Sequence, residues 1–316
     1  MTGWQVQVWR GSHNSSTSAL VWDSGRVLGN TSTNIVYDGV PLVSDTSYDW
    51  SVVWWDEAGL AAPSTFAHFS TAMFAGITDF KGAAWVGGGK MLRSEFVVPT
   101  GARGAIVVTR ARLFITGLGA YKSYLNGQAT DSHELGTFTA YEQRVLYDVW
   151  DVTSLVQIGC NGFGVLIGGW YWASKGQTLA GQGQPTLLVL ISVDTSDGAR
   201  TYFASSTSTS DAAVGGVVPL HFATAASPIT ADSFAGGIDY DASLKQVGWD
   251  RCYFHPTAAW TPASAGVDAL GVNPRGGYPT FSANSLHITI ERSFPIRNFY
   301  PRTDGSVVVD FGQVSC

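Results

Sequence analysis

The sequence predicts an all-β protein, and three observations lead to that prediction. Of its 316 residues, 45% are hydrophobic and 13% are charged, a balance that excludes a disordered chain. Glycine is abundant at 37 residues, and there are 12 Trp, 12 Tyr and 16 Phe, as expected for many short strands joined by tight turns. Alternating apolar stretches recur between turn residues, without sustained helical periodicity. The length is enough for two domains and the start of a third.

The first block, residues 1–72, is predicted to be a small sandwich of the fibronectin III type. Trp50, Val52 and Trp54 alternate along one stretch and therefore share one face of a strand, and residues 56–59 follow as a hairpin turn. Because the block opens directly on a strand, one interpretation is that its first strand is missing. The strands are expected at residues 4–9, 20–22, 35–37, 47–55 and 65–70.

The second block, residues 73–262, is predicted to be a jelly-roll β-sandwich. Its hairpin signals are Asn126-Gly127, which favours a left-handed turn, and residues 194–198. A single helical turn is expected at residues 152–156, capped by Asp151. The strands are expected at residues 96–98, 104–109, 111–116, 120–125, 143–147, 164–168, 186–193 and 201–204.

The third piece, residues 263–316, is predicted to be the incomplete start of a further β-sandwich domain. It has two alternating stretches, residues 285–290 and 306–311, with Pro295 and Pro301 between them. Two strands are too few to close a sandwich alone.

The charge of the chain limits its partners. The net charge is −6 and no basic run occurs, so neither nucleic acid nor an anionic membrane is a predicted partner. No apolar run reaches membrane-spanning length. The N-terminal residues alternate like a strand and lack the basic start and apolar core of a signal peptide, which leaves secreted and cytoplasmic locations both open.

Three cysteines, Cys160, Cys252 and Cys316, are widely spaced and odd in number. This pattern argues against a disulfide framework or a zinc site. The favoured interpretation is that Cys160 and Cys252 are free thiols that pack as small core residues. The alternative is that they pair with each other if the protein is secreted.

Several motifs follow one another along the chain. A stretch reads A-R-L-F-I-T-G-L-G-A-Y and turns through L-N-G, and a later stretch ends in G-G-W-Y. Each motif is weak alone, but their order and intervals together resemble the N-terminal, non-catalytic region of the bacterial-type α-L-rhamnosidases, glycoside hydrolase family 78. The matching residues are 20–25, 48–50, 111–127, 141–153, 161–171, 240–250 and 295–313.

The resemblance implies a parent enzyme that hydrolyses terminal α-L-rhamnosyl residues of glycosides with inversion, using an α/α barrel further along the chain. No stretch here has the helical periodicity of that barrel, so no catalytic residue is carried over, and the chain alone is predicted to be inactive. It is expected to brace the catalytic domain or to bind carbohydrate. Its implied partners are the missing catalytic domain and a rhamnose-containing glycan or glycoside. The alternatives are a stand-alone carbohydrate-binding module and a fibronectin-type adhesion or scaffold protein.

The sequence departs from the family pattern in a few places. Residues 136–139 replace the usual Pro-Gly-Trp-Thr, and Ile238 stands where the family usually has Glu. After Gln313 the family continues Asn-x-x-Gly, whereas this chain ends at Cys316. This end is interpreted as a truncation before the catalytic domain.

Carbohydrate binding is the functional hypothesis that the residues themselves favour. Aromatic rings stack on the apolar face of a sugar, and the loop at Trp170, Tyr171 and Trp172 offers three of them after two glycines. Neighbouring hairpin segments could supply hydrogen bonds from their polar side chains, namely Asn126, Asp131, Tyr141 and Arg144. The competing interpretation is that Trp170 and Tyr171 are core or domain-interface residues.

Metal binding is the weaker hypothesis. Asp239 and Asp241 lie two residues apart on a predicted strand and are candidate calcium ligands, although a solvated strand end explains them better. The resemblance also implies calcium-dependent rhamnose binding in some relatives, with acidic and amide groups near the Gly-Trp loop, where this chain has Gly168 and Gly169. The six histidines are scattered and show no metal-binding spacing.

Overall fold

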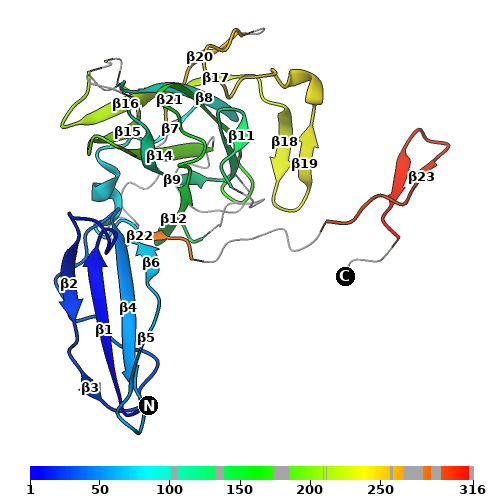
Figure 1. Cartoon of the computed structure of the whole chain (residues 1–316). Coiled ribbons are helices and arrows are strands. Elements are labelled where there is room, and N and C mark those ends of the chain that lie inside the picture. Colours follow the sequence, from blue (N-terminus) through cyan, green and yellow to red (C-terminus); the bar gives the residue numbers. More distant parts are fainter. Residues whose placement is uncertain are drawn as a thin grey trace.

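The computed structural model confirms the all-β prediction (Figure 1). The two helices among the described residues are short 3₁₀ turns, η1 (Gly76–Phe80) and η2 (Ala242–Leu244). No described helix has the length and apolar character needed to cross a membrane. The structure describes residues 1–100, 105–131, 139–173, 185–208, 210, 212–256, 259–266, 280–285 and 293–312.

The first block forms one six-stranded sheet in which β1 and β4 are central. These two strands pair antiparallel over their full lengths, from Gly3 opposite Trp55 to Arg10 opposite Tyr48. Trp50, Val52 and Trp54 share one face, as predicted, because they lie opposite alternate residues of β1. The strands are β1 (Gly3–Arg10), β2 (Ala19–Asp23), β3 (Val27–Leu28), β4 (Ser47–Trp55), β5 (Ala61–Pro63) and β6 (Ala67–Ser70).

The prediction of a strand at residues 35–37 is wrong. This segment is irregular, and its Ile35 and Tyr37 side chains pack on the apolar face of the sheet beside Val6 and Val8. Alternation of apolar residues is equally compatible with a loop that lies across a sheet. The uncovered remainder of that face forms an apolar groove of about 750 Å³.

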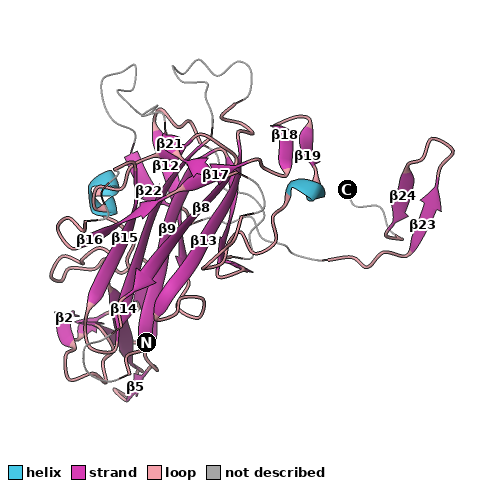
Figure 2. Cartoon of the chain, turned by 90° about the horizontal axis from the view of Figure 1, so that it is seen from above, coloured by secondary structure: helices cyan, strands magenta, loops and turns pink. Residues whose placement is uncertain are grey.

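The second block is a sandwich of an eight-stranded and a six-stranded sheet (Figure 2). The strand order of the eight-stranded sheet is β16-β15-β14-β9-β12-β22, with β7 on β14 and β21 on β7. Its strands are β7 (Val86–Gly87), β9 (Val108–Leu118), β12 (Arg144–Asp151), β14 (Thr186–Thr195), β15 (Arg200–Ser206), β16 (Val217–His221), β21 (Ser264–Ala265) and β22 (Thr280–Ala283).

The six-stranded sheet has the order β11-β10-β13-β8-β17-β20. Asn126 and Gly127 join β10 to β11 with φ angles of 52° and 84°, which confirms the predicted left-handed turn. The strands are β8 (Met91–Val98), β10 (Ala120–Leu125), β11 (Gln128–Ala129), β13 (Gly159–Gly168), β17 (Ala223–Ala225) and β20 (Thr261–Pro262).

The main core lies between the two sheets. Alternate residues of β13, namely Phe163, Val165 and Ile167, face alternate residues of β9 and β14 such as Leu113 and Val189, and all are fully buried. This alternation is the period of two that a strand imposes on its side chains. Burying each such side chain contributes about 1.5–3 kcal/mol before the entropy cost of ordering the chain.

The eight-stranded sheet is buried on its other face as well. Phe114 and Leu190 lie there beneath Phe80 of η1, together with Met73 and Tyr147. This double burial explains why β9 and β14 contain unbroken apolar runs, at residues 113–115 and 187–191, rather than strict alternation. Two predicted strands, residues 104–109 and 111–116, are one strand from residue 108 to 118, which pairs with β14 from Val108 to Leu118.

The third piece is only partly separate from the sandwich. β21 and β22 extend the eight-stranded sheet, β22 by parallel pairing of Thr280 with Arg144. The strand expected at residues 285–290 lies almost entirely outside the described residues, whereas that at 306–311 is confirmed as β24 (Val307–Asp310), paired with β23 (Asn298–Pro301). The β23–β24 hairpin lies away from the sandwich in Figure 1. The predicted boundary at residue 262 stays a prediction.

Residues 246–254, here called the strap, cross the outer face of the six-stranded sheet. Their approach depends on Gly162 and Gly164, because a Cβ atom at Gly162 would lie 2.2 Å from the carbonyl carbon of Arg251 and one at Gly164 would lie 2.6 Å from the Trp249 ring. Cys252 of the strap forms a disulfide with Cys160 of β13, with Cα atoms 6.0 Å apart. The favoured interpretation of two free thiols is therefore wrong, since 92 residues of sequence separation concealed the proximity.

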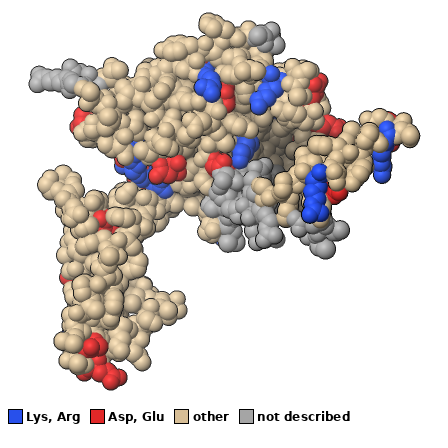
Figure 3. Space-filling view, turned by 45° about the vertical axis from the view of Figure 1, so that its right-hand side comes forward, with Lys and Arg blue, Asp and Glu red and all other residues tan. Residues whose placement is uncertain are grey.

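The first block meets the sandwich at a cluster of charges (Figure 3). The buried Asp45 carboxylate accepts hydrogen bonds from Arg110 Nη2 at 2.6 Å and Arg112 Nη1 at 3.0 Å. Arg200 donates to the Asp45 carbonyl at 3.2 Å and binds Asp194, as does Arg110. Burial raises the pKa of Asp194, but hydrogen bonds and charge from Arg200 outweigh it and hold that pKa below its usual range. The cluster ties both parts together.

The charge cluster yields a stability prediction. Asp45→Asn keeps the side-chain shape and tolerates the left-handed backbone at this residue, where φ is 49°, but leaves Arg112 without its buried counter-charge. We expect the free energy of unfolding to fall by about 3 kcal/mol, measured by denaturant titration. The matched control is Asp38→Asn, an exposed carboxylate of the same block. Equal stability of the two variants would contradict the assigned role of Asp45.

Candidate functional site

The candidate site is at the end of β13, where the chain leaves the sheet through Gly168, Gly169 and Trp170. Trp170 has a φ of 39°, which L-residues seldom adopt and which turns the chain sharply. Its backbone N–H donates to Asp232 Oδ1 at 2.6 Å. The same carboxylate lies against Gly168, where a Cβ atom would approach the Asp232 Cγ within 3.1 Å. Asp232 therefore holds the turn in place.

Asp232 belongs to a hairpin of β18 (Ile229–Ser233) and β19 (Gly237–Tyr240), which stands beside the sandwich in Figure 1. The turn of this hairpin brings Phe234 to the loop. Its ring centroid lies 5.3 Å from that of Trp170 and 5.7 Å from that of Tyr171. Phe234 is 50% exposed, and Trp170 and Tyr171 are half-buried, so the three rings form an accessible aromatic patch.

A charged pair adjoins the aromatic patch. Lys90, just before β8, places Nζ 2.6 Å from Asp232 Oδ2. One carboxylate thus joins the Trp170 turn, a lysine and the β18–β19 hairpin. Groups of this kind, next to aromatic rings, are able to recognise sugar hydroxyls.

Trp172 and Tyr141 do not belong to the accessible patch. Trp172 is 2% exposed and Tyr141 is 3% exposed. Their two rings pack edge to face against each other, and Leu118 and Val145 complete this small core. Burial raises the pKa of Tyr141 to about 12. Neither ring presents a face to a ligand, so Trp172 and Tyr141 are core residues, whereas Trp170 and Tyr171, for which a core or interface role was the competing interpretation, are half-buried.

The polar candidates are dispersed. Asn126 donates to the Leu155 carbonyl at 2.9 Å and accepts from the Gly162 N–H at 2.9 Å, so it stabilises the β10–β11 turn. This turn lies at the opposite end of β10 from Gly168, roughly 15–20 Å away. Asp131 pairs with Lys122 on β10 at 3.0 Å, and Arg144 is exposed at the start of β12 in the other sheet.

The candidate calcium ligands Asp239 and Asp241 are both exposed. Asp241 Oδ1 accepts hydrogen bonds from the Ser243 hydroxyl at 2.6 Å and its N–H at 2.9 Å, and these bonds lower the pKa of Asp241. Asp241 thus caps η2. Among the described residues, neither aspartate belongs to a group of three metal-ligating side chains. The one such group found there consists of Glu95, Cys160 and Cys252.

Sequence reasoning missed Asp232, Phe234 and Lys90. They lie 62, 64 and 80 residues from Trp170, and no periodicity links a hairpin turn to the distant end of a strand. The available signal was local: an aromatic residue, Phe234, directly before the Ala-Gly-Gly turn.

The contrast between the two tryptophans is testable. Trp172→Ala removes a buried ring and should lower the free energy of unfolding by about 3–5 kcal/mol. Trp170→Ala, its matched comparison, removes a half-buried ring at the surface and should cost about 1 kcal/mol. Thermal and denaturant unfolding of both variants measure the difference. Equal losses would show that the two rings are equally buried, against this structure.

Comparison with known proteins adds family information. Residues 107–275 match the family described as the alpha-L-rhamnosidase N-terminal domain, and residues 1–75 match the Rha78A-like N-terminal immunoglobulin domain. The first block is therefore immunoglobulin-like, and its finer fibronectin III assignment stays a prediction.

Curated relatives are named alpha-L-rhamnosidases. One from Alteromonas sp. (strain LOR) is 30% identical over 191 residues, which cover 54% of this chain and 20% of that protein. One from Streptomyces avermitilis is 29% identical over 274 residues, covering 84% of this chain and 23% of that protein. The chain thus spans about a quarter or less of the length of these two relatives.

Solved structures give the same picture. The alpha-L-rhamnosidase from Dictyoglumus thermophilum superposes with a TM-score of 0.77 at 25% identity, covering 99% of this chain and 34% of that one. The Aspergillus terreus enzyme, at 21% identity and a TM-score of 0.73, shares the fold over 99% of this chain and 34% of its own. The chain therefore belongs to the α-L-rhamnosidase family, and it corresponds to the N-terminal part of its members.

Proposed function

We propose that this chain is the non-catalytic N-terminal part of an α-L-rhamnosidase and that it binds a rhamnose-containing glycan at the aromatic patch of Trp170, Tyr171 and Phe234. The parent enzyme would hydrolyse terminal α-L-rhamnosyl residues. Family membership supports the first part of the proposal. The single observation that supports the second is the cluster of accessible aromatic rings beside the Lys90–Asp232 pair.

The chemistry of the patch suits binding better than hydrolysis. Inverting hydrolysis needs an acid and a base roughly 6.5–9.5 Å apart with a water molecule between them. The Asp232 carboxylate is instead committed to Lys90 and to the Trp170 N–H. Asp131, another acidic candidate from the sequence, is paired with Lys122. The Asp232 carboxylate orients the loop, and the rings supply the surface on which a pyranose can stack.

Bracing of a catalytic domain is the second candidate, and a different observation favours it. The sandwich is joined to the first block by ion pairs of Arg110 and Arg112 with Asp45, and the Tyr147 hydroxyl accepts from the N–H of Met73, directly after the first block, at 2.8 Å. A unit stiffened in this way is able to hold a neighbouring domain at a set distance. An adhesion or scaffold role would need the same stiffness but no sugar site.

Sugar binding is tested by calorimetric titration of the protein with L-rhamnose at millimolar concentration. We expect measurable heat, and Phe234→Ala or Trp170→Ala should weaken the affinity about tenfold, because each removes part of the stacking surface. Phe299→Ala is the matched control, since this aromatic residue is 62% exposed on the distant β23–β24 hairpin. A flat titration would contradict the binding proposal. Repeating the titration in EDTA tests the calcium role that the family resemblance implies.

Catalytic competence is tested separately with a nitrophenyl α-L-rhamnoside. The pure 316-residue protein should release no nitrophenol above the buffer blank, because the proposal assigns the acid and base to a part of the parent enzyme outside this chain. A complete α-L-rhamnosidase serves as the positive control. Turnover by protein of verified mass would overturn the non-catalytic assignment while leaving the sugar-binding test unaffected.

A further inference from the structure

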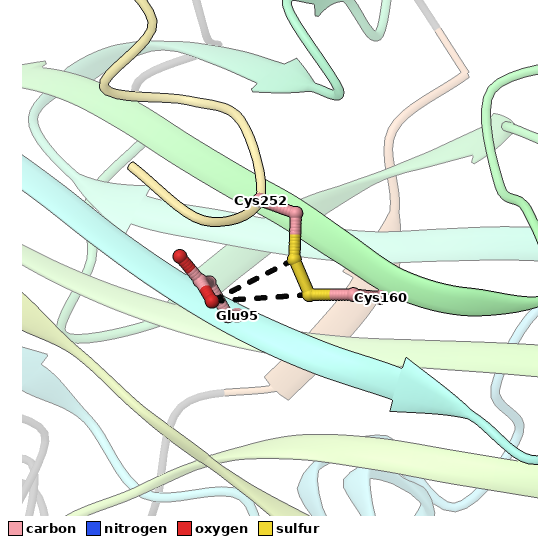
Figure 4. A group of neighbouring side chains, drawn as sticks. All are labelled: Glu95, Cys160 and Cys252. Carbon is pink, nitrogen blue, oxygen red and sulfur yellow. Dashed lines mark hydrogen bonds between the residues drawn. A yellow bond between two sulfur atoms is a disulfide. The ribbon is translucent and has the colours of Figure 1, made fainter. Parts of the chain in front are cut away.

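Glu95, Cys160 and Cys252 converge on the outer face of the six-stranded sheet (Figure 4). Glu95 is on β8 and Cys160 is on β13, which are paired strands, and Cys252 comes from the strap. The Glu95 Oε2 atom lies 3.8 Å from the Cys160 sulfur and 3.6 Å from the Cys252 sulfur. The carboxylate is exposed and both cysteines are half-buried, so reagents in solution reach the group.

The strap is anchored independently of the disulfide. Arg93 Nε donates to the Trp249 carbonyl at 2.8 Å, and Arg93 Nη2 donates to the Arg251 carbonyl at 3.1 Å. The Trp249 ring lies over Gly164 and stacks against Trp260 with centroids 6.5 Å apart. Cys252 should therefore remain opposite Cys160 when the sulfur–sulfur bond is broken.

The group matches the donor set of a thiophilic divalent cation. Zinc bonds to thiolate sulfur at about 2.3 Å and to carboxylate oxygen at about 2.0 Å, so a tetrahedral site places sulfur and oxygen roughly 3.5 Å apart. The two distances from Glu95 Oε2 are close to that value. Two thiolates and a carboxylate would leave a net charge of −1 around the ion, and the Arg93 guanidinium, paired with the other Glu95 oxygen, offsets it.

We propose that Glu95, Cys160 and Cys252 form a zinc-class metal site that opens when the disulfide is reduced. A phosphine reductant gives two electrons to the disulfide and takes the oxygen of one water molecule. The sulfur–sulfur bond breaks and the two water protons complete two thiols. Binding of Zn²⁺ then displaces both thiol protons, and a water molecule fills the fourth position.

The test uses the full chain with Cys316→Ser as background. This substitution removes the third thiol of the chain, which would otherwise bind zinc outside the proposed site. Reduced with a phosphine and titrated with Zn²⁺ against a competing chelator dye, this protein should bind one zinc ion per chain, whereas the oxidised protein should bind none. Replacing Zn²⁺ by Co²⁺ should produce a sulfur-to-cobalt charge-transfer absorption. Reduced protein that takes up no zinc would overturn the proposal.

Two variants separate the ligands. Cys160→Ser together with Cys252→Ser should abolish binding, and Glu95→Gln should weaken it by roughly tenfold while leaving both thiols in place. Unchanged affinity in Glu95→Gln would remove the carboxylate from the site and overturn the three-ligand assignment. The melting transition of the reduced protein, with and without Zn²⁺, is the second measurement. Loss of that transition in both conditions would also overturn the proposal, since it requires the strap to stay in place after reduction.

Discussion

The structure of the sandwich depends on the apolar contact between its two sheets. Within that contact, β13 positions both the aromatic loop and the disulfide. Phe163, Val165 and Ile167 point into the core and are fully buried. A strand fixed in this way along its inner face cannot slip by one residue without exposing all three side chains. Because Cys160 lies near the start of β13 and the aromatic loop follows its last residue, Gly168, the packing of β13 fixes the positions of both.

The outer face of β13 allows the strap to pack closely against the strand. Gly162 and Gly164 lack the Cβ atoms that would hold the strap away, and Arg251 and Trp249 occupy the freed space. Glycine is unfavourable inside a strand, by roughly 0.5–1 kcal/mol relative to alanine. The contacts of the strap, which include the bonds from Arg93 to two strap carbonyls, offset this cost. One strand thus supports a hydrophobic core on one side and a covering segment on the other.

Charge is scarce in this chain, and several of its charged side chains lie where two segments are joined. Asp45 binds two arginines where the first block meets the sandwich. Asp232 joins Lys90 to the turn at Trp170. The exposed Glu95 carboxylate pairs with half-buried Arg93 beside the strap. Truncating one partner of a pair that is largely shielded from water costs more than the pair contributes, so Asp45 and Asp232 specify geometry more than they add stability. Of these carboxylates, Asp232 holds the loop that carries the aromatic patch.

The sequence by itself determined the fold class, most of the strands and the family. Alternation at Trp50, Val52 and Trp54 and the turn at Asn126-Gly127 are local properties, because each follows from the backbone period or from left-handed φ angles. Local patterns gave a wrong prediction where an irregular segment packs on a sheet. Residues 35–37 alternate like a strand but form a loop that covers the sheet.

Only the tertiary structure decided which side chains meet. The sequence placed Trp170, Tyr171 and Trp172 in one loop. In the structure, Trp172 is buried and does not belong to the aromatic patch, whereas Phe234 from a distant hairpin does. The disulfide between Cys160 and Cys252 was likewise invisible in the spacing of the cysteines. The physical reason is the same in each case: contacts between distant segments depend on how strands pair and how hairpins fold back, and no local period records that geometry.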